Sequence, residues 1–200
     1  VAAGAAAVYG VTVLAYTFLP LPGPGWCATH TSPPRDLRPF HSVEVIARAA
    51  VGLSPRGLLI SPAFLQVAMN VVLFVPWGAF ARRLFGLPAW AAVLSGCLCS
   101  VVIEATQGTA VWGLFACVFR SADIDDVITN TTGAAVGALL APLLLRWVPD
   151  ARSDLAHRGD PRPVDRPRRL LGMLIDAGAF FGTWVALQVA WRGWNRYGRV

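Results

Sequence analysis

Between residues 66 and 145, the apolar runs of the sequence are interrupted by carboxylate, amide and guanidinium side chains that could do chemistry. These polar residues are Asn70, Glu104, Gln107, Arg120, Asp123, Asp125, Asp126 and Asn130. Such groups are costly to bury in lipid, so within membrane-spanning segments they are functional candidates by default. We expect them to meet in one polar cluster near one face of a membrane.

Three of the carboxylates, Glu104, Asp123 and Asp126, are the candidate catalytic residues. A carboxyl group whose pKa is raised by burial or by a neighbouring carboxylate can act as a general acid or base. Together with Asp125, these side chains could supply the oxygen ligands of Mg²⁺ or Ca²⁺. No Ser–His or Cys–His arrangement stands out, so the sequence leaves open whether the chain is an enzyme.

The other polar positions suit recognition of a substrate or lipid headgroup. These candidates are Asn70, Gln107, Arg120 and Asn130. Arg120 could hold a phosphate through two parallel hydrogen bonds. Spacings of i, i+3 and i+7 place Asp123, Asp126 and Asn130 on one helix face, and Asp125 points elsewhere. Ser121 is the expected N-cap of this helix.

The composition is that of an integral membrane protein. The 200 residues are 56% hydrophobic and only 14% charged, well below the quarter that soluble domains carry. The net charge is +6, and every basic residue is arginine. Because the arginines lie mostly between apolar runs, they indicate membrane topology and lipid headgroups as partners, and not nucleic acid.

The apolar runs predict an all-α, polytopic transmembrane helical bundle. Expected spans cover residues 1–19, 62–80, 87–107, 123–147 and 170–190. The first run lacks a positive segment before it, which favours a retained span over a signal peptide. The segment 42–53 has the apolar spacing of a short amphipathic helix in the membrane interface.

The order of these runs predicts three regions. Residues 1–147 form a domain of four spans, residues 148–168 form a polar linker rich in Arg, Asp and Pro, and residues 169–200 form an additional span. Glycine pairs at small-xxx-small spacing, Gly133 with Gly137, indicate close helix packing. This packing could be within one chain or within a homodimer.

Arginines near the span ends set the expected orientation in the membrane. They are denser on the side that holds Arg82, Arg83 and Arg146, which we assign to the cytoplasm. The polar cluster then faces outward. Cys27 and Cys117 fall on that same outer side and could form a disulfide, whereas Cys97 and Cys99 are expected to be buried free thiols.

Four stretches, in this order, resemble the VanZ-like family. They are Arg38-Pro39-Phe40, residues 70–78 from Asn70 to Gly78, Ile103-Glu104-Ala105-Thr106-Gln107, and residues 120–133 from Arg120 to Gly133. The resemblance covers about residues 1–147. It implies a bacterial cell-membrane protein linked to resistance to the glycopeptide teicoplanin, with the eight polar residues named above at the family's polar positions.

The C-terminal run has a different resemblance. The stretch from Arg169 to Asp176 is similar to the opening span of RDD-family membrane domains. That similarity suggests that the natural protein continues past Val200.

These observations lead to one expected function and two alternatives. The protein binds or modifies a lipid-linked or lipophilic molecule of the cell envelope. Alternatively, it is a metal-dependent membrane enzyme that acts on a phosphorylated lipid. In the third interpretation it is a structural membrane bundle, in which the polar residues only hold the helices together.

Overall fold

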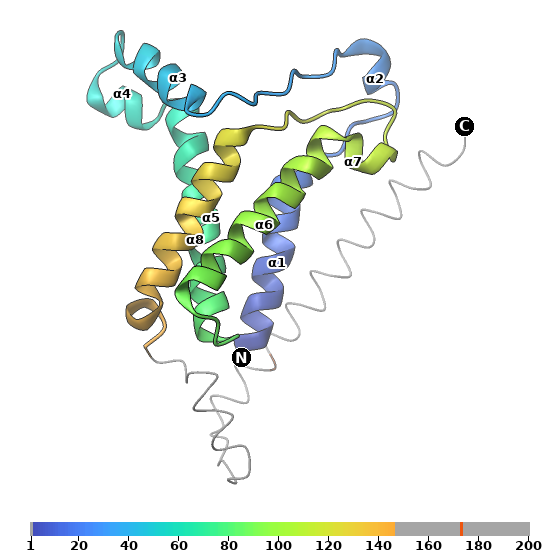
Figure 1. The fold of residues 1–200 in the computed structure, drawn as a ribbon. Helices are drawn as coiled ribbons and strands as arrows, with labels where there is room; N and C mark the ends of the chain where they lie inside the picture. Colours follow the sequence, from blue (N-terminus) through green and yellow to red (C-terminus); the bar gives the residue numbers. More distant parts are fainter. Residues whose placement is uncertain (1, 147–172, 174–200) are drawn as a thin grey trace. The chain divides into compact units, whose positions relative to one another are not determined.

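The computed structural model describes residues 2–146 and Met173, and within that part of the chain it contains eight helices and no strand (Figure 1). The predicted all-α class is confirmed for these residues. Contacts divide the chain into two compact units. Of the described segment 2–146, residues 2–30 belong to the first unit and residues 31–146 to the second.

The first unit contains α1 (Ala2–Phe18) and the single turn α2 (Trp26–Thr29). Helix α1 has 17 residues and is apolar, as the run at 1–19 predicted. It is shorter than the two helices that are long and apolar enough to cross a membrane. The predicted count of four spans within residues 1–147 is therefore not established by the structure.

The second unit is built on three long helices that pack against one another, α5 (Pro62–Arg83), α6 (Ala89–Gly108) and α8 (Ile124–Leu144) (Figure 1). By length and composition, α5 and α6 could each span a membrane. The chain enters α5 through the N-cap Ser61, whose side chain accepts a hydrogen bond from the Phe64 N–H. These helices agree with the predicted spans to within three residues at each end.

Helices α5 and α8 approach closely because glycines line their contact. A Cβ added at Gly137 would lie 1.9 Å from the Val75 carbonyl oxygen, and one added at Gly133 would lie 2.2 Å from the Val71 carbonyl oxygen. On the α5 side of this contact, a Cβ added at Gly78 would lie 1.9 Å from the Ala134 carbonyl oxygen of α8. The predicted glycine pair is thus used for packing within the chain.

Helix α6 packs on α8 through small residues as well. A Cβ at Gly96 would lie 2.5 Å from the Cβ of Ala134. At one end of the bundle, the fully buried Ala92 and Ala138 join Ala81 in a core cluster. This core of small side chains brings the backbones close together and fixes where the polar residues of each helix lie.

The amphipathic segment forms α3 (His41–Ala50), followed by the short helix α4 (Pro55–Leu59) (Figure 1). No residue of α3 is buried, and Val43 is 60% exposed. Its apolar side chains are therefore not used in the core of the unit. The location of this helix in the membrane interface remains a prediction.

The start of α8 differs from the prediction. Its N-cap is Asp123, whose side chain accepts a hydrogen bond from the Asp125 N–H at 2.8 Å. Ser121 is not the cap, because its hydroxyl donates to the Pro34 carbonyl oxygen. The connection before it contains α7 (Ala110–Gly113), a turn with positive φ throughout.

Several predictions concern residues that are not described. The linker 148–168 and, apart from Met173, the RDD-like segment 169–200 lie outside the described residues. The division of the chain into three regions stays a prediction. Cys97 and Cys99 are free thiols, as expected. A Cys27–Cys117 disulfide also stays a prediction, because these cysteines belong to the two separate units.

Candidate functional site

The polar residues of the second unit gather where α6 ends and α8 begins. Glu104 lies in the last turns of α6 and is 8% exposed. Its Oε2 accepts a hydrogen bond from the Asp123 backbone N–H at 2.8 Å. The carboxylate of Asp123 in turn caps α8. The structure therefore brings together two of the three candidate catalytic residues.

The third candidate, Asp126, faces α5. Its Oδ1 accepts a hydrogen bond from Nδ2 of Asn70 at 2.6 Å. Asn70 is 8% exposed, so this contact joins α5 to α8 inside the bundle. A hydrogen bond to a charged carboxylate is stronger than one between neutral groups, and this one fixes the two helices in register.

Asn130 lies one turn deeper along α8 and faces α6. Its Nδ2 donates to the hydroxyl of Ser100 at 2.9 Å, and both residues are almost fully buried. Among the described residues, the buried acceptor Oδ1 of Asn130 has no hydrogen-bond partner. Asn130 was predicted to bind a headgroup, but its depth and its bond to Ser100 are typical of a packing contact.

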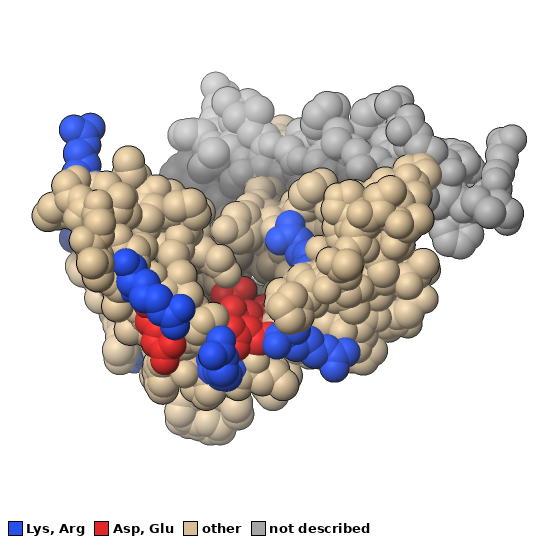
Figure 2. Space-filling view, turned by 90° about the horizontal axis from the view of Figure 1, so that it is seen from above, with Lys and Arg blue, Asp and Glu red and all other residues tan. Residues whose placement is uncertain are grey.

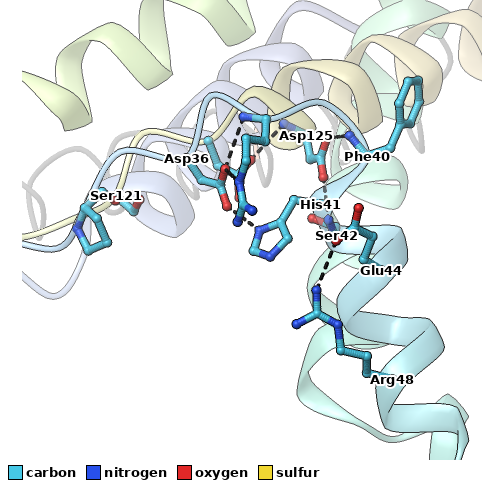
Figure 3. Close-up of polar contacts among 11 residues, drawn as sticks. Asp36, Phe40, His41, Ser42, Glu44, Arg48, Ser121 and Asp125 are labelled. Carbon is cyan, nitrogen blue, oxygen red and sulfur yellow. Dashed lines mark hydrogen bonds and ion pairs between the residues drawn. The ribbon is translucent and has the colours of Figure 1, made fainter.

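Asp125 points away from Asp126, as its spacing predicted, and it holds the segment before α3 (Figure 3). It is 4% exposed. Its Oδ1 accepts from the Phe40 N–H and its Oδ2 from the Ser42 N–H, both at 2.6 Å. Phe40 has a φ of 66°, which a non-glycine residue rarely adopts. Asp125 thus anchors the chain on both sides of His41.

The predicted metal site is not assembled. Among the described residues, no three His, Cys, Asp or Glu side chains are placed so that they could hold a metal ion. The proposed ligands Glu104, Asp123, Asp125 and Asp126 therefore do not form one set. The physical reason is that both oxygens of Asp125 are directed to backbone N–H groups of the α3 segment.

An apolar cavity opens beside Glu104, and we refer to it as the groove cavity. It measures about 320 Å³ and lies between α6 and α8. Its surface is almost wholly apolar and includes Leu37, Val101, Ile124 and Val127, and the residues Arg35, Glu104, Thr109 and Asp123 border it. The cavity therefore has a surface suited to hydrocarbon, and residues of both charges lie at its border.

The arginine at the groove cavity is Arg35, and the sequence did not single it out. Its Nη2 donates to the Gly108 carbonyl oxygen at 2.8 Å, which fixes the guanidinium at the end of α6. The predicted Arg120 is half-buried and Gln107 is buried, but neither belongs to the lining of this cavity. No local pattern marks Arg35, because its partners lie far along the chain.

A second cavity of about 280 Å³ lies on the other side of Asp123, and we refer to it as the His41 cavity. Its polar lining consists of Asp36, His41, Ser42, Gln66, Ser121 and Asp123. Nδ1 of His41 is hydrogen-bonded to Oδ2 of Asp36 (Figure 3). Asp36 and His41 were also missed, although they flank the Arg38-Pro39-Phe40 stretch that the sequence did mark.

Acidic side chains with arginines beside them are visible from this end of the molecule (Figure 2). Burial raises the pKa of the Asp123 carboxyl, and the charges of Asp125 and Asp36 raise it further. The pKa of Asp36 is lowered, mainly because the Arg38 backbone N–H donates to it at 3.1 Å. The two carboxylates at the His41 cavity thus differ in how readily they ionise.

Apolar helices of spanning length, joined at one end by carboxylate and amide contacts, define the class as helical membrane proteins. The VanZ/LLP1 family model matches residues 6–145, and the chain belongs to this family. No curated protein and no solved structure matches the chain. The family assignment made from the four sequence stretches is therefore confirmed.

Proposed function

We propose that this VanZ-family membrane protein binds or modifies a lipid-linked or lipophilic molecule of the bacterial cell envelope. The observation that carries the proposal is the groove cavity, where an apolar surface between α6 and α8 meets Arg35 and Glu104. An acyl or prenyl chain would lie against Val101 and Val127, and its polar end would reach the two charged side chains.

The proposal includes the orientation and the biological consequence expected from the sequence. The polar end of the bundle faces outward, where envelope molecules are found. An effect on susceptibility to teicoplanin-type glycopeptides follows from the family resemblance. A lipophilic ligand held at this end would account for such an effect without any reaction.

Filling the groove cavity tests the proposal. Val127→Trp places an indole in the cavity, whereas Val136→Trp changes an outward position of the same helix that is 36% exposed. We expect Val127→Trp to lower the amount of co-purified lipid per protein at least about tenfold, which corresponds to about 1.4 kcal/mol. Mass spectrometry of lipids extracted from the purified protein measures this amount.

The control variant separates occlusion from damage to the fold. Val136→Trp is expected to retain the lipid content and the teicoplanin susceptibility of the unmodified protein. Equal lipid content in both variants, with both proteins monodisperse, would contradict a ligand in the groove cavity.

Specific contacts favour a second candidate, in which the polar residues serve only for helix packing. The Asn70–Asp126 and Asn130–Ser100 hydrogen bonds join the three long helices. Asp126→Asn keeps the shape and one acceptor oxygen. The packing interpretation predicts a lower melting temperature in detergent for this variant. Our proposal instead predicts that Glu104→Gln, at the groove cavity, loses lipid while the melting temperature stays nearly unchanged. The metal-dependent enzyme has no comparable support, because the carboxylates do not converge.

A further inference from the structure

The His41 cavity lies outside the groove cavity and contains a side-chain pair that the proposed function does not use. His41 lines this cavity and is bound to Asp36 through Nδ1. The side chains of the pair are about one quarter and one fifth exposed, at 25% and 21%, so solvent and a ligand can reach them. Asp123 lines both cavities, which therefore share one wall.

The hydrogen bond to Asp36 determines which imidazole nitrogen of His41 can accept a hydrogen bond from a ligand. An ionised carboxylate only accepts hydrogen bonds, so Nδ1 of His41 carries the proton that is shared with Asp36. In the neutral imidazole, Nε2 then has a lone pair and accepts a hydrogen bond from a partner. A carboxylate in this position fixes both the tautomer and the orientation of the ring.

The backbone on both sides of this pair is held firmly. Asp36 pairs with the segment before α8, since its N–H donates to the Ala122 carbonyl oxygen at 2.9 Å and its carbonyl oxygen accepts from the Ile124 N–H at 3.0 Å. Asp125 accepts from the N–H groups of the residues before and after His41. Such double anchoring is typical of a pre-organised binding group.

The lining of the His41 cavity indicates the chemistry of its ligand. It includes two carboxylates, an amide, an imidazole and hydroxyl groups, but neither arginine nor lysine. Arg38, which lies outside this lining, pairs with Asp36 at 3.5 Å, so Asp123 is the carboxylate that would repel a phosphate or carboxylate. Hydroxyl groups both donate and accept, so they can satisfy carboxylate oxygens, the Gln66 amide and Nε2 of His41 together.

We propose that the His41 cavity binds a neutral headgroup with several hydroxyl groups, one of which donates to Nε2 of His41. Asp36 is the positioning residue that holds the imidazole in the accepting tautomer. This inference rests on the proposed function, because the headgroup belongs to the same lipophilic molecule whose chain occupies the groove cavity.

The test uses three probes with the same chain and different headgroups. These are octyl glucoside, octyl phosphate and octyltrimethylammonium, each added below its micelle-forming concentration to the full-length protein in amphipol. Binding is measured from the ligand-dependent rise in melting temperature, which reports the dissociation constant. We expect octyl glucoside to bind most tightly.

Variants of the pair show whether His41 is responsible. His41→Gln is expected to weaken octyl glucoside binding about tenfold, the effect of losing one well-placed hydrogen bond, and to leave the other two probes unchanged. Asp36→Asn allows the ring to carry its proton on Nε2 and should also weaken octyl glucoside binding. The control is His30→Gln, since His30 is exposed and, within the part of the chain that the structure describes, its side chain bonds to Trp26 and Thr29 of its own turn.

The outcomes distinguish this inference from the proposed function. Tighter binding of the cationic or the anionic probe, or unchanged glucoside binding in His41→Gln, overturns the inference. If the inference is overturned but Val127→Trp still weakens the binding of all three probes, the proposed function is kept without the inference about the His41 cavity. If no probe binds the unmodified protein, both ideas are wrong.

Discussion

The two halves of helix α8 hold the bundle together by different means. The first half, from Asp123 to Asn130, contacts its neighbours through hydrogen bonds to side chains and backbone N–H groups. The second half, from Gly133 to Ala141, contacts them through glycine and alanine at backbone distance.

This difference assigns the stability of the bundle to one half of α8 and ligand binding to the other half. Close contact between backbones gains dispersion energy along the seam and needs no ligand. The polar half has hydrogen bonds that satisfy some of its charged groups, but both cavities open beside it. We infer that the small-residue half holds the long helices together and that ligands can bind beside the polar half.

The largest expected effect comes from the small-residue half. Gly137→Ala places a Cβ 1.9 Å from the Val75 carbonyl oxygen, and because that atom belongs to the backbone, α5 and α8 must move apart. We expect a loss of about 3 kcal/mol in the free energy of unfolding. Thermal denaturation followed by circular dichroism in detergent measures it.

The matched control is Gly10→Ala in α1, where an added Cβ meets nothing within 4 Å. It should be neutral or stabilise the helix by up to about 1 kcal/mol. Equal melting temperatures for the two variants would show that the seam is less tight than the structure indicates.

A smaller effect is expected where the polar half anchors α3. Asp125→Asn replaces one acceptor oxygen by an amide that faces a backbone N–H, so one of the two bonds to Phe40 and Ser42 is lost. The expected cost is about 2 kcal/mol. Hydrogen exchange should become faster in residues 40–50, while the long helices remain protected.

Glu44→Gln provides the comparison for this variant. It breaks only the exposed pair with Arg48, at 3.0 Å, and should cost no more than about 0.5 kcal/mol. Unchanged exchange rates in Asp125→Asn would mean that the anchoring of α3 does not depend on this carboxylate.

The smallest effect concerns the pH dependence of Asp123. Its pKa is raised mainly by burial, so the folded state binds the proton more readily than the unfolded chain does. The stabilisation from Asp123 is complete at pH values below the pKa that its carboxyl has in the unfolded chain. It is lost as the pH rises through the higher pKa that the carboxyl has in the folded protein. Asp123→Asn keeps an N-cap without charge, and it should flatten this dependence and be slightly more stable at neutral pH.

Melting temperatures between about pH 4 and pH 8 check this prediction. Asp36, whose pKa is lowered, contributes in the opposite direction in both proteins, so the difference between the two curves isolates Asp123. Parallel curves would contradict it. Asp123→Ala, which also removes the cap, should be about 1 kcal/mol less stable than Asp123→Asn at every pH.

Much of the fold could be predicted from the sequence. Apolar runs locate the long helices, because predominantly hydrophobic segments of about 20 residues have few other stable arrangements. The spacing of Gly133 and Gly137 indicated a packing face, and that of Asp123, Asp126 and Asn130 indicated a shared side of α8. The helix positions, the family and the gathering of polar residues at one end depend on local patterns of this kind.

The candidate site could be predicted only in part. Glu104 and Asp123 do meet where α6 ends and α8 begins, but Asp126 faces Asn70 of α5. Asp125 was taken for a metal ligand, but it anchors residues that lie 83 and 85 positions away in the sequence. Arg35, Asp36 and His41 come from a connection that has no periodic pattern. Nothing in the local sequence marks their contacts with α6 and α8.

The sequence by itself determined that this is a helical VanZ-family membrane protein with polar groups near the ends of its apolar runs, because hydrophobicity and residue spacing are properties of the chain alone. The tertiary structure decided which of these groups bind each other and which line a cavity. Close packing at Gly78, Gly133 and Gly137 sets the distances between the helices, and hydrogen bonds form only where those distances allow.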